Sequence, residues 1–369
     1  MTVDNRPAET DTDELTLDDL DALTTLVGDV LAEVCTPDRL ADPAGAAETA
    51  WRALDEVGVT RLGLCETGGG HGADLSAATA VLRVVGEHAA PGPLAETSLL
   101  GGRLLEAAGL AQPSGPVTTG PATLVTTREG TGRRVRGTVR RVPAAPGATT
   151  VAIAVGDDGE ELLVLLPDTG LEISHGHNLA REPRDTITID IALDTAHPLP
   201  VGTARELRLR GGLSRAALSA GALIRVRDRT LAYAGERVQF GHPLSAFQAV
   251  QHQLARLVAE TAAANAAVDQ AVRAALRCGF ADPHTELVVA AAKVRTAQAA
   301  TLGPAVAHQI HAALGMTEEH PLHHSTTRLW SWRSEWGNEA SWSETIADRA
   351  IAAGSTGLWP FLTGIPGLR

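Results

Sequence analysis

The spacing of apolar residues along this chain changes twice, and those changes limit the folds it can adopt. From residue 15 to about 110, apolar side chains recur every three or four positions, as in "LDDLDALTTLVGDVLAEV", which is typical of amphipathic helices. Between residues 117 and 200 the chain carries short runs rich in Val, Ile and Thr, such as "TTVAIAV" and "TITIDIAL", which is typical of strands. Helical spacing returns after residue 200. The pattern predicts an α+β fold with a helical domain (1–116), a small β domain (117–200) and a helical bundle (201–369).

The last of these regions contains long helical segments. The expected helices include "GLSRAALSAGALIRVRDRTLAYAGERV", "SAFQAVQHQLARLVAETAAANAAVDQAVRAAL" and "HTELVVAAAKVRTAQAATLGPAVAHQIHAAL". Their alanine-rich stripes favour close approach of neighbouring helices, as in a bundle.

Charge and composition exclude several classes of partner. The net charge is −13, and a nucleic-acid duplex or an anionic membrane surface repels such a protein unless it has a basic patch. No apolar run reaches the length of a membrane span, and the acidic N-terminus does not have the form of a signal peptide. We therefore expect a cytoplasmic protein that acts on neither nucleic acid nor membranes.

No metal site is predicted either. Cys35, Cys65 and Cys278 are far apart in sequence and form no C-x-x-C pair. The histidines between residues 307 and 324 do not follow the H-E-x-x-H spacing, and no cysteine accompanies them.

Residues 307–339, "AHQIHAALGMTEEHPLHHSTTRLWSWRSEWGNE", hold five of the thirteen histidines and three of the six tryptophans. Glu335 and Glu339 are four positions apart and would share a face if this segment were helical. Among tryptophans, a carboxylate would have a raised pKa and could remove a proton from a weakly acidic C–H group. The alternative is that Glu335 pairs with Arg328 or Arg333 on a solvated face.

Two further segments could bind an anion or a heterocycle. Arg237 lies beside a turn and a helix start, where guanidinium charge and free N–H groups converge. In "QIHAALG" a helix ends in a turn at which Gly315 can take a positive φ, and Gln309 could donate a hydrogen bond. The alternatives are an ordinary helix hairpin and a packed helix end.

Taken together, these motifs resemble those of the acyl-CoA dehydrogenase family, most specifically after residue 200. The family pattern R-x-x-F-G-x-x-[ILV]-x-x-x-Q is matched by Arg237, Phe240, Gly241, Leu244 and Gln248. The later patterns Q-[IV]-x-G-G-x-G and Thr-x-Glu-[HY]-Pro are matched by Gln309, Ile310, Gly315, Thr317, Glu319, His320 and Pro321. The order of helices, β domain and four-helix bundle is that family's architecture.

The resemblance implies a flavoprotein that forms a double bond between Cα and Cβ of an acyl-CoA thioester. FAD is the implied cofactor, and an electron-transfer flavoprotein is the implied acceptor. The implied contacts to a flavin held mainly by a neighbouring subunit come from Arg237, Phe240, Gln248, Gln309, Ala313 and Gly315. Because each cofactor then closes an interface, a dimer or tetramer is expected.

Three departures bear on whether this chain has a complete site. The β domain does not contain the Thr-Glu-x-x-x-Gly-Ser-Asp loop or the Trp-[IV]-[ST] strand that cradle the flavin ring. Ala312 and Ala313 replace the paired glycines of the adenosine turn. The position of the catalytic glutamate holds Trp336, so Glu335 is one residue early, and one residue rotates a helical side chain by about 100°. The second position used for the base in this family holds Gly211.

These departures favour one subunit of a heteromeric, actinobacterial-type acyl-CoA dehydrogenase, which keeps the contacts given across the interface and has lost its own site. The alternatives are a self-sufficient acyl-CoA dehydrogenase with Glu335 as its base, and a structural or acyl-CoA-binding protein without flavin. A flavin monooxygenase or nitroalkane-type oxidase on the same fold is a further alternative.

Overall fold

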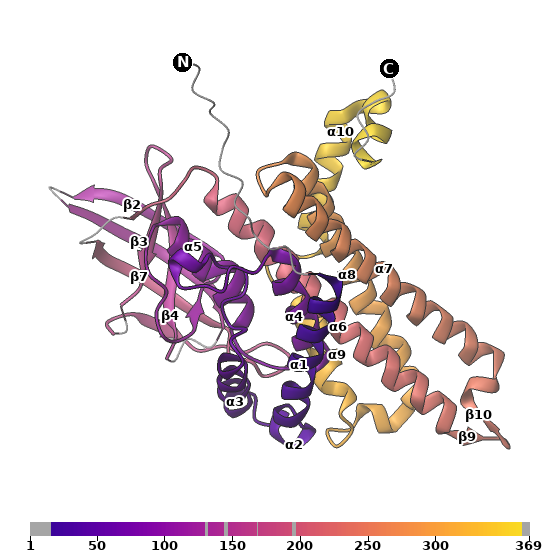
Figure 1. The fold of residues 1–369 in the computed structure, drawn as a ribbon. Coiled ribbons are helices and arrows are strands. Elements are labelled where there is room, and N and C mark those ends of the chain that lie inside the picture. The colour runs from indigo at the N-terminus through magenta and orange to yellow at the C-terminus, as the bar shows by residue number, and fades with distance from the viewer. Residues whose placement is uncertain (1–15, 130–131, 144–146, 168, 194–196, 364–369) are drawn as a thin grey trace, which may run out of the picture.

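The computed structural model describes residues 16–129, 132–143, 147–167, 169–193 and 197–363. The chain forms an N-terminal group of helices, a β-sheet and a set of long helices, in that order, as the acyl-CoA dehydrogenase-like α+β prediction requires. In Figure 1 the sheet lies on the left, the N-terminal helices lie in the middle, and the long helices run toward the lower right.

The N-terminal helices begin with a capped helix. The side chain of Thr16 accepts a hydrogen bond from the Asp19 amide while the Asp19 carboxylate accepts one from the Thr16 amide, which satisfies two amides at the first turn. The elements of this region are α1 (Leu17–Val34), α2 (Pro37–Leu40), α3 (Pro43–Glu56), η1 (Glu66–Gly68), α4 (Leu75–Glu87), η2 (Glu96–Leu100) and α5 (Gly101–Ala107).

The predicted strands pair into one mixed sheet. Its strands are β1 (Val117–Thr118), β2 (Ala122–Glu129), β3 (Gly132–Val142), β4 (Thr149–Gly156), β5 (Glu161–Leu165), β6 (Glu172–Ser174), β7 (Asp185–Leu193) and β8 (His197–Pro198). Their order is β6-β7-β3-β2-β4-β5-β8, with β1 also paired to β4. Alternate residues such as Val135 and Val139 on β3 face the core of the sheet domain. A bulge interrupts the pairing of β3 and β7 between Val139 and Val142.

The long helices are antiparallel neighbours joined by short turns. The elements are α6 (Thr203–Glu236), β9 (Val238–Gln239), β10 (His242–Pro243), η3 (Leu244–Ala246), α7 (Gln248–Cys278), α8 (Pro283–His311), η4 (Ala312–Met316), α9 (Leu322–Trp332) and α10 (Glu339–Thr363). The β9–β10 hairpin lies at the far end of the bundle, and α10 extends from the opposite end (Figure 1).

Glycines let α6 pack directly against α4. A Cβ atom at Gly221 would overlap the backbone carbonyl of Arg83, and one at Gly86 would overlap the carbonyl of Leu218. The two backbones are therefore in contact at a point where any other residue would push the helices apart. This contact fixes the N-terminal domain onto the first helix of the bundle, and α6 in turn carries the residues that meet the turn around Glu335.

Candidate active site and subunit edge

Glu335 lies in a turn between two helices. Because α9 ends at Trp332 and α10 begins at Glu339, the segment between the two glutamates is not helical, and the condition for a shared helical face is not met. The chain leaves helical geometry here because Trp336 and Gly337 both have positive φ, 57° and 107°. Glu335 is buried and Glu339 is exposed.

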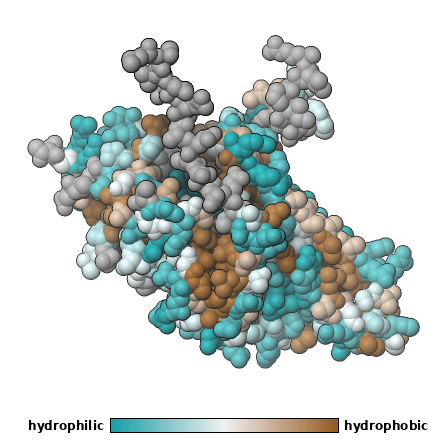
Figure 2. Space-filling view, in the orientation of Figure 1, coloured by the Kyte–Doolittle hydropathy of each residue, from teal (hydrophilic) through white to brown (hydrophobic). Residues whose placement is uncertain are grey.

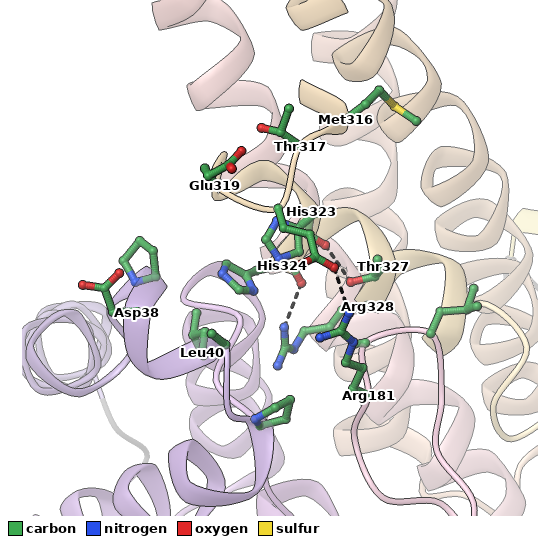
Figure 3. Close-up of a pocket in the computed structure, with 16 residues that line it drawn as sticks. Asp38, Leu40, Arg181, Met316, Thr317, Glu319, His323, His324, Thr327 and Arg328 are labelled. Carbon is green, nitrogen blue, oxygen red and sulfur yellow. Dashed lines mark hydrogen bonds and ion pairs between the residues drawn. The ribbon is translucent and has the colours of Figure 1, made fainter. Parts of the chain in front are cut away.

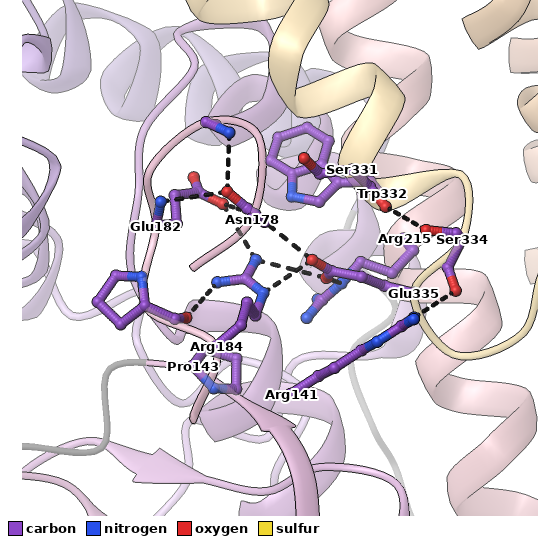
Figure 4. Close-up of polar contacts among 12 residues, drawn as sticks. Arg141, Pro143, Asn178, Glu182, Arg184, Arg215, Ser331, Trp332, Ser334 and Glu335 are labelled. Atoms are coloured by element: carbon purple, nitrogen blue, oxygen red, sulfur yellow. Dashed lines mark hydrogen bonds and ion pairs between the residues drawn. The ribbon is translucent and has the colours of Figure 1, made fainter. Parts of the chain in front are cut away.

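The carboxylate of Glu335 is held by two guanidinium groups. Arg184 donates from Nε to Oε1 at 2.7 Å, and Arg215 donates from Nε to Oε2 at 2.7 Å. Figure 4 shows both arginines directed at this carboxylate, with Asn178 also oriented toward it. Arg184 comes from the segment before β7 and Arg215 from α6, so the contact joins the sheet domain to the bundle.

The partners expected for Glu335 are engaged elsewhere. Arg328 donates from Nε to the carboxylate of Glu182 at 2.9 Å, and Arg333 donates to the hydroxyl of Thr301 at 3.0 Å. The alternative of a solvated Glu335 paired with Arg328 or Arg333 is therefore wrong. Sequence spacing favoured these residues because they are near in the chain, whereas the actual partners are more than a hundred positions away.

The expected raised pKa of Glu335 is also wrong. Burial by itself raises the pKa of this carboxyl, but the charges of Arg184 and Arg215, and the hydrogen bonds they donate, outweigh burial and hold the pKa well below its ordinary value. Such a carboxylate is a weak acceptor of a substrate proton near neutral pH. Its role as a catalytic base stays a prediction.

The ion pair continues in both directions. Arg215 also pairs with Glu96 of η2, which is buried in the N-terminal domain. Arg184 also pairs with Glu182 at 3.0 Å, and Glu182 accepts the bond from Arg328 of α9. The result is an alternating chain of carboxylates and guanidiniums, which we call the buried ion chain: Arg328, Glu182, Arg184, Glu335, Arg215 and Glu96. It crosses all three structural regions, and its side chains are at most 10% exposed.

Lys293, the only lysine, lies next to this chain. It is 1% exposed, and its ammonium donates to the carbonyl of Trp332, the last residue of α9, at 2.6 Å. Burial lowers the pKa of Lys293 to about 7, and the nearby Glu335 opposes that effect. The sequence motifs did not point to Lys293, Arg184 or Arg215. A usable signal was present, because Lys293 and Arg215 each interrupt an otherwise small or apolar stretch of helix.

The two positions at which the resemblance predicts a base meet in space. The indole of Trp336 packs over Gly211 of α6, where a Cβ atom would overlap the ring. The carbonyl of Trp336 accepts a hydrogen bond at 3.1 Å from Nε1 of Trp342, which is seated on the neighbouring Gly212. Trp336 is 7% exposed and Trp342 is fully buried. Neither position therefore presents a group that accepts a proton.

An apolar cavity of about 490 Å³ opens beside Trp336. Its walls are β2, β4, the first turns of α6, and the turn at Trp336 and Gly337. Val125 and Val155 contribute from the sheet, and Arg208 is the one charged residue in the lining. The guanidinium of Arg208 lies 4.0 Å from the ring centre of Trp342, which keeps the cation at the edge of the cavity. The space suits an apolar ligand.

The end of the bundle at the β9–β10 hairpin carries exposed side chains. Arg237 follows the last residue of α6, and Phe240 and Gly241 form the two-residue turn of the β9–β10 hairpin with φ values of 51° and 80°. Phe240 is 92% exposed and Gln248 is exposed at the first turn of α7. Within the described part of the chain, the side chains of Arg237 and Gln248 have no hydrogen bond or ion pair.

Apolar residues accompany these polar groups. Val238 is 52% exposed beside Phe240, and Leu314 and Met316 of η4 are 48% and 70% exposed. Figure 2 shows apolar residues at this end of the bundle within a largely hydrophilic surface. A surface that combines unpaired polar groups with exposed apolar side chains is typical of an interface.

The second predicted contact segment lies at the end of α8. Gln309 and Ala313 are exposed there, and Gln309 makes no side-chain hydrogen bond to other described residues. The positive φ falls on Ala312, at 52°, and not on Gly315 as the sequence suggested. Gly315 is required for a different reason, because a Cβ atom there would lie 2.6 Å from Cβ of His311.

Several histidines of the 307–324 segment stack on or bond other side chains. Among the described residues, no group of three or more His, Cys, Asp or Glu side chains is placed to bind a metal ion. His311 stacks on Tyr233 of α6 with ring centres 4.4 Å apart, and His308 bonds the hydroxyl of Thr326. His323 and His324 line a cavity of about 330 Å³ between α2 and α9, where Figure 3 shows them near Arg328 and Leu40.

Comparison with known proteins matches the C-terminal part of the chain to a family. The model "Acyl-CoA dehydrogenase, C-terminal domain" matches residues 209–351, which include α7, α8, α9 and the turn around Glu335. Residues 209–351 thus match the acyl-CoA dehydrogenase family. The members of that family are flavin oxidoreductases that depend on FAD.

Sequence and structure relatives agree with this assignment. The acyl-CoA dehydrogenase IpdE2 of Mycobacterium tuberculosis is 28% identical over 77% of this chain and 81% of its own length. A chain of the ChsE4–ChsE5 complex of the same organism superposes with a TM-score of 0.80 at 23% identity, covering 91% of this chain and 98% of that chain. A variant of the Tcur3481–Tcur3483 steroid ACAD superposes with a TM-score of 0.79 at 26% identity, covering 92% and 99%.

The residues present fit FAD at one end only. The bundle end offers a guanidinium and two amides without partners inside the described chain, which suits the phosphates and adenosine of a cofactor presented from outside. Around Glu335, by contrast, the charged side chains bond one another. Within the described residues, no helix is long and apolar enough to cross a membrane.

Proposed function

We propose that this chain is the degenerate subunit of a heteromeric acyl-CoA dehydrogenase. Its Arg237, Phe240, Gln248 and the turn from Gln309 to Gly315 contact an FAD that a homologous partner subunit holds. The assembly removes two hydrogens from an acyl-CoA, and the partner supplies the flavin-ring pocket and the base.

The observation that carries the proposal is the contact between Trp336 and Gly211. These are the two positions from which a base would act, and an indole packed on a glycine fills both. Glu335, the nearest carboxylate in sequence, is bonded to two guanidiniums, and its pKa is lowered. A subunit that keeps its cofactor-facing edge while its own centre is filled with side chains is what a partner subunit requires.

Two relatives support a heteromeric assembly. The ChsE4–ChsE5 structure is that of a complex. The name of the Tcur3481–Tcur3483 steroid acyl-CoA dehydrogenase (ACAD) likewise joins two protein names. We extend from these proteins to the present chain the expectation of a second, homologous subunit and of a steroid-derived or fatty acyl thioester as substrate.

One observation favours a second candidate, an acyl-CoA-binding protein without flavin. The cavity of about 490 Å³ beside Trp336 is largely apolar and would accept an acyl chain without any chemistry following. The unpaired Arg237, Gln248 and Gln309 remain unexplained in that reading.

The visible absorption spectrum separates the candidates. The chain is purified alone and then after co-expression with a homologous dehydrogenase subunit from the same organism. A colourless chain that yields a yellow complex with one FAD per pair, bleached by an acyl-CoA, supports the partner role. A yellow chain that an acyl-CoA bleaches without any partner contradicts it and restores Glu335 as the candidate base. A colourless chain and a colourless mixture favour the binding protein.

A further inference from the structure

One guanidinium nitrogen of Arg328 has no hydrogen-bond partner among the described residues. Arg328 is 1% exposed, and its Nε and Nη1 donate to the Glu182 carboxylate and the His324 carbonyl, both at 2.9 Å. Its Nη2 is also buried but donates no hydrogen bond. A buried donor without an acceptor costs about 1–3 kcal/mol, and such groups are rare in folded proteins. An acceptor supplied from outside the chain would remove that cost.

Arg328 lies in the wall of a cavity of about 330 Å³ at the start of α9. In Figure 3 its guanidinium lies below His324, with Leu40 of α2 across from both. The α9 residues of the lining come from the first two turns, so the cavity is at the other end of this helix from the turn around Glu335. The apolar part of the lining consists of Pro37, Leu40, Ala41, Pro43, Leu179 and Ala180.

Two histidines add hydrogen-bond acceptors to the lining. Nδ1 of His323 bonds the carbonyl of His320 at 2.8 Å, so Nδ1 carries the proton and Nε2 presents the lone pair of the neutral ring. The ring of His324 bonds the backbone of Pro37, which offers only a carbonyl, so its N–H is used there. Burial lowers the pKa of His324 to about 3, which leaves the ring neutral with one acceptor nitrogen. The cavity thus combines a donor with two acceptors.

The charges of the lining disfavour an anionic ligand. Asp38 and Glu319 are exposed there and form no ion pair with described residues. The two cations of the lining, Arg181 and Arg328, are already paired with carboxylates. A carboxylate or phosphate would therefore meet like charges, whereas a neutral group would not. A primary carboxamide is neutral and offers both a carbonyl acceptor and two N–H donors.

We propose that this cavity binds a small molecule that carries a primary carboxamide. Its carbonyl oxygen accepts from Nη2 of Arg328, its amide N–H groups donate to the imidazoles of His323 and His324, and its apolar part packs on Leu40. This goes beyond the partner role proposed above and does not depend on it. The ligand is bound without chemical change.

Saturation-transfer NMR on the chain alone at pH 8, with benzamide and benzoate as probes, tests the proposal. The two probes have nearly the same shape and differ in the group that would meet Arg328. We expect benzamide to bind about tenfold more tightly than benzoate, or better. Arg328→Lys keeps the charge beside Glu182 but removes Nη2, and should weaken benzamide by a similar factor. The matched control is Arg333→Lys, an exposed site outside this lining, which should leave benzamide binding unchanged.

A second pair of variants keeps the test valid if Arg328→Lys does not fold. Ala41→Trp fills the cavity from an exposed position that carries no polar side chain, and should block benzamide. Ala44→Trp, which is exposed outside this lining, should not.

Three results would overturn the proposal. They are no benzamide binding at millimolar concentration, equal affinity for benzamide and benzoate, and equal benzamide affinity in either variant and its control. Formation of the yellow complex with a partner subunit is followed in the Ala41→Trp variant and is expected to be unchanged, so this proposal and the proposed function fail separately.

Discussion

The charged side chains at the turn around Glu335 are buried and paired, whereas the polar side chains at the far end of the bundle are exposed. In the buried ion chain, the carboxylates and guanidiniums are joined to one another inside the protein. At the far end, Arg237, Gln248 and Gln309 are left without partners among the described residues. A buried charge that lacks a partner costs desolvation energy, whereas an exposed charge is solvated and can stay unpaired until a ligand binds. The difference agrees with the proposal that the first region serves this chain's own fold and that the second contacts another molecule.

The largest expected effect comes from breaking the buried ion chain at its centre. Glu335→Gln removes the negative charge that Arg184 and Arg215 share, while both guanidiniums stay buried. Removing one partner of a buried ion pair costs about 3–5 kcal/mol of folding stability. Chemical denaturation at pH 7 measures the loss, with Glu339→Gln, an exposed site four residues away, as the control. A Glu335→Gln variant as stable as the natural chain, but inactive in the assembled enzyme, would contradict this role and support a catalytic base.

The stability difference between the natural chain and the Glu335→Gln variant should also depend on pH. The folded-state pKa of Glu335 is lowered, so its contribution to stability is complete above the unfolded pKa of about 4.3 and is lost as the pH falls below that value. The gap in melting temperature between the natural chain and the Glu335→Gln variant should therefore be widest near pH 7 and close as the pH falls from about 4. A gap that stays constant from pH 7 to pH 3 would show that Glu335 is not ionised in the fold.

A smaller effect is expected at the other end of the bundle. Arg237→Ala removes an exposed guanidinium that makes no contact among the described residues, so the free energy of unfolding should change by less than about 0.5 kcal/mol. In the complex with a partner, the affinity for FAD should fall by about 1.5–3 kcal/mol, the value of a hydrogen bond to a charged group. Flavin retention after gel filtration measures this change. The control is Arg256→Ala, which removes an exposed arginine nearer the middle of α7. Unchanged retention would remove Arg237 from the cofactor edge.

The sequence predicted the elements better than it predicted their contacts. The helices, the strands and their order follow from periodicity, which is a local property, and the family motifs located the exposed residues on the bundle end. The partners of Glu335 could not be predicted in this way, because Arg184 and Arg215 come from distant segments that meet only when the sheet docks on α6. The raised pKa was expected because the nearby tryptophans suggested an apolar pocket, and nothing local indicated two converging guanidiniums. Contacts of this kind depend on the tertiary arrangement.

The smallest expected effect concerns the turn that follows α8. Ala312 has φ 52° and ψ −137°, a conformation that glycine adopts readily and alanine does not. Ala312→Gly should therefore stabilise the chain by about 1 kcal/mol, since the relief of strain exceeds the extra freedom gained by the unfolded chain. Ala313→Gly, at the neighbouring exposed position without a positive φ, is the matched control and should be neutral or slightly destabilising. Thermal denaturation of both variants decides the point. If Ala312→Gly also leaves FAD retention in the complex unchanged, the strain is incidental. If retention falls, the strained alanine fixes the turn in the shape that the partner's cofactor requires, and the edge of this subunit is preorganised for a molecule that it does not hold by itself.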